Sequence, residues 1–347
     1  MKTIRLMWTL LPILLGAGTE QLHAQQAEAD RKRFQEIKAE AEKGDATAQN
    51  NLGNCYVYGV GVLKDFSEAV KWYRKAADQG DSTAQSNLGS SYAYGHGVAK
   101  DSAEAVKWFR KAADQGNAIA QFNLGVCYAD GNGVLKDSGE AVKWYLKAAD
   151  QKYATAQINL GNCYAKGDGV TKDSAEAVKW FRMAADQGDA LAQAKLGGCY
   201  ALGDGVLKDS AEAVKWFRKA ADQGDPTAQS ILGGHYAVGD GVPKDYVEAH
   251  KWLNLASAQG NEIARKKLAT LERGMTTEQI ADAQRVARSF KPRKALEMGA
   301  SESRQGIAAT RPAGSGTGFF ISEDGFLITN EHVVKGRRKS GCSPARE

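Results

Sequence analysis

The sequence has little excess charge for its length. Its 46 lysines and arginines and 41 aspartates and glutamates leave a net charge of +5 over 347 residues. No stripe of lysine and arginine gathers on one face, so the sequence indicates no nucleic-acid partner. The chain also lacks the ligand sets of a metal site, and its Gly-x-Gly pairs lack the strand and third glycine of a phosphate-binding loop. We therefore expect no metal and no cofactor.

A long apolar run is missing everywhere except at the N-terminus. Lys2 and Arg5 precede a mostly apolar stretch over residues 6–17, and residues 22–24 form a plausible cleavage site. This arrangement is typical of a bacterial secretory signal peptide, here residues 1–24. We therefore expect a periplasmic or secreted protein with no membrane contact after cleavage. The alternative is an uncleaved anchor, although the apolar stretch is short for a membrane span.

Tryptophan and glycine are periodic in this chain. Six of the seven tryptophans follow one another at steps of 36 residues, at Trp72, Trp108, Trp144, Trp180, Trp216 and Trp252. A Leu-Gly pair keeps the same step, from residues 52–53 to residues 232–233. A fixed period of this size is typical of a solenoid of stacked repeats. The sequence thus predicts six repeats over residues 45–260.

One repeat, residues 45–80, predicts two helices joined by a turn. Asp45 is a suitable N-cap for the first helix, and a Gly-x-Gly turn at residues 59–61 is expected to end it, because glycine adopts the left-handed cap. Asp65, with Glu68 three residues later, predicts a capping box at the start of the second helix. A single helix pair cannot bury both of its faces, so neighbouring repeats must stack.

Segments on both sides of the array are expected to cover its ends. Residues 25–44 predict an N-terminal capping helix, and residues 261–290 predict two C-terminal capping helices. The last of these helices is polar, with Thr276 or Thr277 as its N-cap. A polar outer face is what the terminal unit of a solenoid needs for solubility.

The repeat resembles the Sel1-like repeat. The matching pattern is Ala-x-x-x-Leu-Gly-x-x-Tyr-x-x-Gly-x-Gly-Val at residues 48–62, followed by Asp-x-x-x-Ala-x-x-Trp-x-x-x-Ala-Ala-x-x-Gly at residues 65–80. The tetratricopeptide repeat is a relative with a shorter period. The resemblance implies an all-α fold, an α/α superhelical solenoid of helix–turn–helix repeats. It also implies a scaffold that docks a partner protein or peptide on its concave face, and no catalytic chemistry.

One position of the repeat is a cysteine in four units, at Cys55, Cys127, Cys163 and Cys199. Equivalent positions in stacked repeats lie about 9–10 Å apart, the spacing of packed helices. A disulfide needs Cα atoms within about 7 Å. We therefore expect unpaired, buried thiols. Cysteine-rich relatives of the family it resembles carry two cysteines per unit, and this chain lacks the second.

The position before each Leu-Gly pair is an asparagine in four units, at Asn51, Asn87, Asn123 and Asn159. Asparagine is unfavourable inside a helix, so its recurrence at this position suggests a specific role. In the tetratricopeptide relatives, asparagine at the matching position bonds the backbone of a bound peptide, which implies an amide ladder for a partner segment. The alternative is an exposed polar position without function. Phe122 and Ile158 stand one residue earlier and could form an apolar pocket or pack in the core.

The composition changes abruptly after the predicted caps. Residues 291–313 are predicted to be a linker, and residues 314–336 alternate around Asp324-Gly325 as a β-hairpin does. This segment resembles the opening of a trypsin-like, Deg-type serine protease, with His332 at the position of the general base. The Asp and Ser of the triad do not follow it. Residues 337–347 are predicted to be a disordered tail.

Two hypotheses on function follow. The first is an exported, non-enzymatic scaffold that binds a protein or peptide of unknown identity. The alternative is the regulatory or targeting part of a trypsin-like serine protease, inactive in this chain because only His332 of the triad is present. The predicted C-terminal end of the fold is accordingly a short β-hairpin fragment or a disordered tail.

Overall fold

The computed structural model describes residues 24–292. The chain divides into two compact units, one up to Lys136 and one from Asp137 onward, and each is considered by itself. Residues 24–292 form helices and turns and contain no strand. This is the all-α, helix–turn–helix repeat architecture that the sequence predicts.

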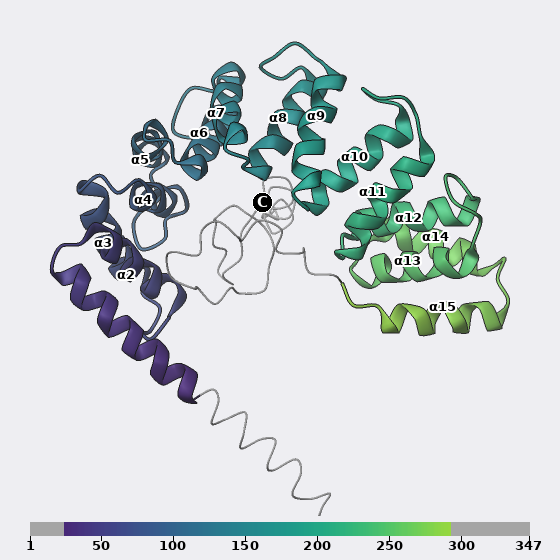
Figure 1. Cartoon of the computed structure of the whole chain (residues 1–347), viewed down its shortest axis with the longest axis horizontal. Coiled ribbons are helices and arrows are strands. Elements are labelled where there is room, and N and C mark those ends of the chain that lie inside the picture. The colour runs from purple at the N-terminus through teal and green to yellow at the C-terminus, as the bar shows by residue number, and fades with distance from the viewer. Residues whose placement is uncertain (1–23, 293–347) are drawn as a thin grey trace, which may run out of the picture. The chain divides into compact units, whose positions relative to one another are not determined.

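Each repeat contributes a first and a second helix. The first unit contains the N-terminal helix 24–42, α2 (Ala46–Tyr58), α3 (Phe66–Asp78), α4 (Ser82–Tyr94), α5 (Ser102–Asp114) and α6 (Ala118–Asp130). The second contains α7 (Ser138–Asp150), α8 (Ala154–Lys166), α9 (Ser174–Asp186), α10 (Ala190–Leu202), α11 (Ser210–Asp222), α12 (Pro226–Val238), α13 (Tyr246–Ala258), α14 (Glu262–Glu272) and α15 (Thr277–Ser289). Within a unit, each first helix packs on the second helix of its own repeat and on that of the preceding repeat (Figure 1).

The first helices begin and end where the sequence predicts. At the start of α2, the Asp45 carboxylate accepts a hydrogen bond from the Ala48 N–H at 2.6 Å. This bond satisfies one of the free N–H groups of the first turn. Gly59 ends the helix in the left-handed conformation, with φ of 72°. Asp81 and Gly95 cap α4 in the same way.

The capping boxes predicted for the second helices are only half formed. Asp65 accepts from the Glu68 N–H at 2.9 Å, as predicted. The predicted reciprocal bond from the Asp65 N–H to the Glu68 side chain does not form. This N–H instead donates to the Tyr56 carbonyl of α2, at 2.9 Å. Glu68 forms an ion pair with Lys71 instead, at 2.8 Å. The tertiary contact with the first helix therefore supplies the acceptor that a local box would have supplied.

The two helices of a repeat approach closely at the glycine of the Leu-Gly pair. A Cβ atom on Gly89 of α4 would lie 2.7 Å from the Phe109 ring of α5, which is too close for any side chain. Leu88 beside it is fully buried. Leucine thus fills the core while glycine admits the aromatic ring of the second helix. Other repeats pair the same two positions, as Gly53 with Tyr73, Gly161 with Phe181 and Gly197 with Phe217.

Successive repeats touch through the second glycine of each Gly-x-Gly turn. Gly97 has φ of 69°, and a Cβ atom on it would lie 2.1 Å from the Phe66 carbonyl oxygen in the preceding repeat. Gly133 meets the Ser102 carbonyl oxygen at the same distance. The turn glycine therefore permits backbone-to-backbone packing between repeats, in agreement with a turn rather than a phosphate-binding loop.

A lysine covers the outward face of most periodic tryptophans. The Lys111 ammonium lies 4.0 Å from the centroid of the Trp108 ring, and equivalent contacts occur at Lys75, Lys147 and Lys219. Such a cation over an aromatic face is favourable by about 0.5–2 kcal/mol. One turn away, Lys107 pairs with Glu104 at 2.9 Å. The outer surface of the second helices is thus largely one of paired charges.

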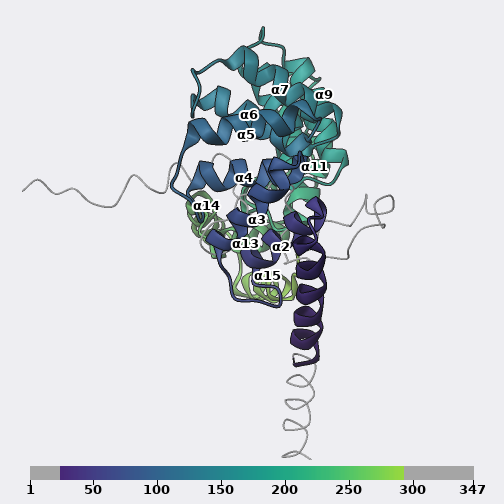
Figure 2. The same cartoon turned by 90° about the vertical axis from the view of Figure 1, so that its left-hand side faces the viewer.

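The N-terminal helix 24–42 covers the start of the first unit. Its Phe34 is buried and meets the Tyr56 ring edge-on, with centroids 5.6 Å apart. The first residues of the helix are exposed, and Figures 1 and 2 show the helix running on beyond α2 and α3.

Two helices close the second unit. α14 takes the place of a seventh first helix, whereas α15 packs on α13 rather than on α14. Thr276 is the N-cap of α15 and forms a complete capping box with Gln279. Phe290, just after α15, meets the Trp252 ring edge-on at 5.4 Å. The last repeat is thus covered by both capping helices.

Candidate functional site

The asparagine register does not form a uniform exposed ladder. Asn51, Asn87 and Asn159 are half-buried on the first helices α2, α4 and α8. Asn87 donates its amide to the Asn50 side-chain oxygen in the preceding repeat, at 2.9 Å. Asn123 on α6 is buried, and neither atom of its amide has a hydrogen-bond partner within residues 24–292. One amide of the register therefore serves repeat packing, and another cannot reach solvent.

Replacing Asn123 with leucine is expected to stabilise the protein. A buried polar group without a partner costs about 1–3 kcal/mol, and an apolar side chain of similar size removes that cost. We expect Asn123→Leu to raise the free energy of unfolding by about 1–2 kcal/mol, measured from the midpoint of urea denaturation. Asn87→Leu, which breaks the bond to Asn50, should give no such gain. A destabilised Asn123→Leu variant would show that this amide has a partner.

Phe122 and Ile158, the candidate apolar pocket, are both buried, at 4% and 3% exposure. Both side chains are therefore core residues in this structure and present no surface to a partner. This burial favours the packing role over the docking role.

A register of buried glutamines was missed at the sequence level. Gln85 of α4 donates its amide to the Ala77 carbonyl at the end of α3, at 3.1 Å, and accepts from the Gln115 amide at the end of α5, at 2.7 Å. It thereby ties a first helix to two second helices. The other buried members are Gln49, Gln121, Gln157, Gln193 and Gln229. Their regular spacing of 36 residues could have identified them from the sequence. Their burial shows that their role is structural.

An apolar face lies on the first helices α10, α12 and α14. Its side chains are Leu191 and Leu202 of α10, Ile231 and Val238 of α12, and Ile263 of α14, and we call them the α10–α14 apolar face. Leu202 is 81% exposed, Val238 72% and Ile263 64%. On α8 of the same unit, the positions of Leu191, Ile231 and Val238 carry Thr155, Asn159 and Lys166. Large aliphatic side chains grouped in this way typically mark an interaction site.

The sequence held a signal for this face. Lys195 and Ile231 interrupt the asparagine register on α10 and α12. The interruption marks where the exposed side of the first helices changes from polar to apolar. Exposure itself could not be assigned from sequence, because Leu52, Leu88 and Leu124 on the same kind of helix are fully buried.

The four register cysteines are free thiols. Cys55 and Cys127 are buried, as expected, whereas Cys163 and Cys199 are half-buried. Burial raises the pKa of Cys127 to about 12, with a smaller contribution from the Asp130 carboxylate. Burial likewise raises the pKa of Cys163 and of Cys199 to about 11. At neutral pH all three stay protonated, and the thiol form is a poor nucleophile.

Alkylation of Cys127 by iodoacetamide is expected to be slow at pH 8. With its pKa near 12, the thiolate fraction is about 10³-fold smaller than in an unfolded chain, where cysteine titrates near 8.5. Because the folded pKa is raised, the rate should keep rising about tenfold per pH unit above pH 9. Mass spectrometry after timed labelling, with and without urea, measures both rates. A plateau of the native rate near pH 9 would contradict the raised pKa.

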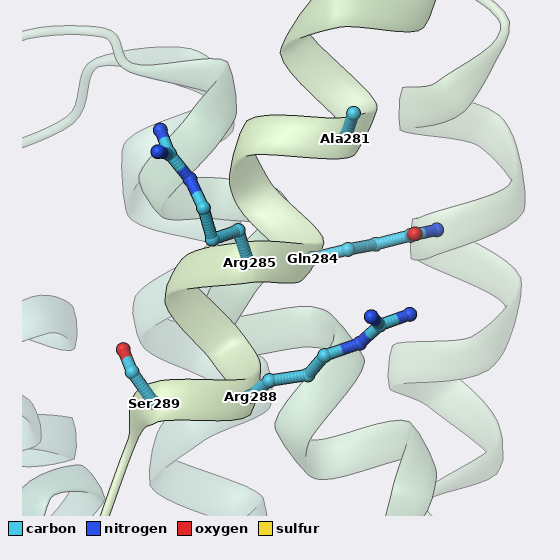
Figure 3. Close-up of a pocket in the computed structure, with 5 residues that line it drawn as sticks. All are labelled: Ala281, Gln284, Arg285, Arg288 and Ser289. Atoms are coloured by element: carbon cyan, nitrogen blue, oxygen red, sulfur yellow. The ribbon is translucent and has the colours of Figure 1, made fainter. Parts of the chain in front are cut away.

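A shallow hollow lies beside the closing helix α15. Its lining residues are Ala281, Gln284, Arg285, Arg288 and Ser289. Figure 3 shows Gln284 and Arg288 pointing to one side of the helix and Arg285 to the other. Arg285 also pairs with Asp282 at 2.8 Å. These side chains diverge instead of converging on one point, so the hollow has no arrangement for a specific ligand.

Several predicted segments lie outside residues 24–292. They are the signal segment up to residue 23, the C-terminal β-hairpin fragment at residues 314–336 with His332, the tail 337–347 and nearly all of the linker 291–313. Within residues 24–292, no helix is both long and apolar enough to cross a membrane. In the same range, His, Cys, Asp and Glu form no group suited to hold a metal ion.

Comparison with known proteins shows similarity along most of the chain. The family described as Sel1 repeat matches residues 46–81, 82–117, 118–153, 154–189, 190–225 and 226–261. A search of curated proteins finds no match. Among solved structures, the chain is similar to c5321, "a protective antigen present in uropathogenic Escherichia coli strains displaying an SLR fold", at 33% identity and a TM-score of 0.71. That match covers 85% of this chain but only 65% of the length of c5321.

A second similar structure is a Sel1 repeat protein from Oxalobacter formigenes, at 36% identity and a TM-score of 0.60. The match covers 68% of this chain and 94% of that protein. The six family matches each start at the first residue of a first helix, so the sequence repeat and the structural repeat coincide. Sel1 repeats generally mediate protein–protein interaction, and proteins built from them are generally non-catalytic scaffolds. Because the repeats cover more than half of its length, the chain belongs to the Sel1 repeat family.

Proposed function

We propose that this protein is an exported scaffold that binds a segment of a partner protein on the exposed side of its first helices. The observation that carries the proposal is the α10–α14 apolar face, where Leu202 and Val238 are exposed on successive first helices. The second helices, by contrast, cover their tryptophans with lysines and pair many of their charges. The first-helix side of the second unit is therefore the surface that gains most from a partner.

The size of the face suits moderate affinity. Burying an exposed leucine or valine contributes roughly 1.5–3 kcal/mol. Three or four such side chains, less the cost of ordering a flexible partner, correspond to a dissociation constant in the micromolar range, about −8 kcal/mol. Separately from this face, the first unit offers a polar contact in the proposal, in which half-buried Asn51 bonds a partner backbone and Asn87 does so once it releases Asn50.

Peptide display on the purified protein tests this proposal. We expect selected peptides to bind with micromolar dissociation constants in fluorescence anisotropy, and Leu202→Ser with Val238→Ser to weaken them at least tenfold. Leu63→Ser with Leu135→Ser is the matched control, because these leucines are 89% and 91% exposed and lie outside the face. An equal loss of affinity in the control variant, or an affinity unchanged by both pairs of substitutions, would show that peptides do not bind at this face. Unchanged affinity of Asn51→Ala with Asn87→Ala would reject the amide ladder alone.

We include export and the absence of catalysis in the proposal. The charged and apolar pattern of residues 1–24 supports a periplasmic or secreted location, which fractionation of cells that express the full chain can test. The resemblance of residues 314–336 to a protease opening supports a link to a trypsin-like peptidase, with His332 at the position of the general base and no Gly-x-Ser-Gly-Gly nucleophile loop among the 347 residues. A fluorophosphonate probe should therefore leave the chain unlabelled, and labelling that a serine-protease inhibitor blocks would overturn this part.

A further inference from the structure

The α10–α14 apolar face has a cation at its centre. A Cβ atom on Gly234 of α12 would lie 3.3 Å from the Lys267 ammonium of α14, so this lysine reaches over the middle helix of the three. Lys179, Lys215 and Lys251 of the same unit each pair with a glutamate. Lys267 forms no ion pair within residues 24–292.

Beside the exposed side chains of this face, part of the helix backbone is uncovered. A Cβ atom on Gly198 of α10 would meet nothing within 4 Å, and one on Gly234 would meet only Lys267. These glycines lie one helical turn before Leu202 and Val238 respectively. Large side chains of an occupant can therefore lie beside Leu202 and Val238 in contact with the helix backbone. The matching occupant is a segment with apolar residues at both ends and a carboxylate between them.

The chain itself contains such a segment. Residues 318–329 read Gly-Phe-Phe-Ile-Ser-Glu-Asp-Gly-Phe-Leu-Ile-Thr, with Glu323 and Asp324 between two apolar triplets. Phe319, Ile321, Glu323 and Leu327 share one face of an extended chain, and Ile321 and Leu327 lie up to ~20 Å apart in it. Three successive first helices span about 20 Å at the usual helix spacing. The segment thus matches the face in polarity, in charge and in length.

We propose that residues 318–329 of this chain dock on the α10–α14 apolar face as an extended segment, in place of the predicted hairpin, which is marginal by itself in water, and compete there with the partner. The inference rests on the proposed function, because it names the regulation of the same face. Phe319, Ile321 and Leu327 contribute the apolar contacts, while Glu323, on the same face of the extended segment, pairs with Lys267. A partner that binds the face must first displace the chain's own segment.

The chain leaves the second unit close to this face. Pro292 lies 3.5 Å from the Cβ position of Gly224, which precedes α12 by two residues. Val238, at the far end of α12, is about 18 Å along the helix axis. The connection between Pro292 and residue 318 has about 26 residues and spans up to ~85 Å when extended, so the segment reaches the face. Tethering supplies an effective concentration near millimolar, at which even a contact of about 100 μM affinity is mostly formed.

Photo-crosslinking within the full chain tests the proposal. Benzoylphenylalanine in place of Phe319 is irradiated in dilute protein, and monomeric products are digested and mapped by mass spectrometry. We expect cross-links to α10, α12 or α14, with the yield reduced at least fivefold by Leu202→Ser with Val238→Ser. Leu63→Ser with Leu135→Ser should leave the yield unchanged. Cross-links elsewhere, no cross-links, or cross-links found only between two molecules would overturn the proposal.

A charge exchange tests the central ion pair. Lys267→Glu should lower the cross-link yield at least threefold, and Glu323→Lys with Asp324→Lys in the same chain should restore most of it. No loss with Lys267→Glu, or no recovery with the exchanged charges, would overturn the assigned pairing. Circular dichroism of each variant shows whether the repeats remain folded.

The two proposals can fail separately. Peptide display is repeated on a chain with Phe319→Ser, Ile321→Ser and Leu327→Ser, whose segment no longer docks. If peptides bind it through Leu202 and Val238 but the parent chain gives no cross-links, the scaffold function stands and the docking of residues 318–329 is wrong. If cross-links form but no peptide binds the triple variant, the segment docks and the scaffold function fails.

Discussion

Gly97→Ala is expected to lower the free energy of unfolding of the first unit by at least about 3 kcal/mol. A left-handed conformation costs a non-glycine residue about 1–2 kcal/mol, and φ of Gly97 is 69°. The new methyl group would also lie 2.1 Å from the Phe66 carbonyl oxygen. Relieving that overlap requires two repeats to separate, so stacking is lost as well as local strain gained. The midpoint of urea denaturation, followed by circular dichroism, measures the effect.

Gly116→Ala is the matched control for this prediction. Gly116 also has a positive φ, 87°, but a Cβ atom there meets nothing within 4 Å. It should lose only the conformational part, about 1–2 kcal/mol. The difference between the two variants measures the close approach of one repeat to the next. Equal losses would show that the repeats do not depend on the contact between Gly97 and Phe66.

Trp108→Ala is expected to cost about 3–5 kcal/mol, the range for a large aromatic removed from a core. Trp108 is 5% exposed, and its indole N–H donates to Glu104 at 2.9 Å. Truncation leaves a cavity beneath Lys111, which loses the ring under its ammonium. Because each repeat contacts only its neighbours, the loss should centre on α4 and α5. Hydrogen exchange resolved by peptide measures the protection of each helix.

Trp108→Phe separates packing from polar contacts. Phenylalanine keeps most of the buried area and a π-face for Lys111 but removes the bond to Glu104, so a loss of about 1–2 kcal/mol is expected. A full-sized loss in this variant would mean that the hydrogen bond, and not the ring, stabilises the repeat. A negligible loss in Trp108→Ala would contradict the close-packed core altogether.

Capping shows how far local sequence determines local structure. Asp45 and Gly59 cap α2 as predicted, because an N-cap and a left-handed C-cap depend on residues within one turn. The box at Asp65 and Glu68 is incomplete, because the Asp65 N–H meets a carbonyl of another helix, at Tyr56. The local pattern could not include an acceptor that only the folded repeat brings near.

The candidate site divides in the same way. The repeat period identified both the asparagine register and its interruption at Lys195 and Ile231. From the sequence, however, the asparagines were the stronger candidates for binding a partner. In the folded chain, Asn123 is buried and Asn87 bonds a neighbouring repeat. Exposure is a property of the stack rather than of a residue type, so the surface of α10, α12 and α14 was not evident beforehand.

By itself, the sequence determined the class, the period and the ends of most repeat helices. These features follow from short-range rules: apolar spacing, caps, and glycine where the backbone turns. The tertiary structure alone decided which periodic residues are buried in the core and which are exposed. Gln85 and Asn123 became interior groups, while Leu202 and Val238 became surface. The reason is physical, since burial depends on what the neighbouring repeats cover, and no single repeat carries that information.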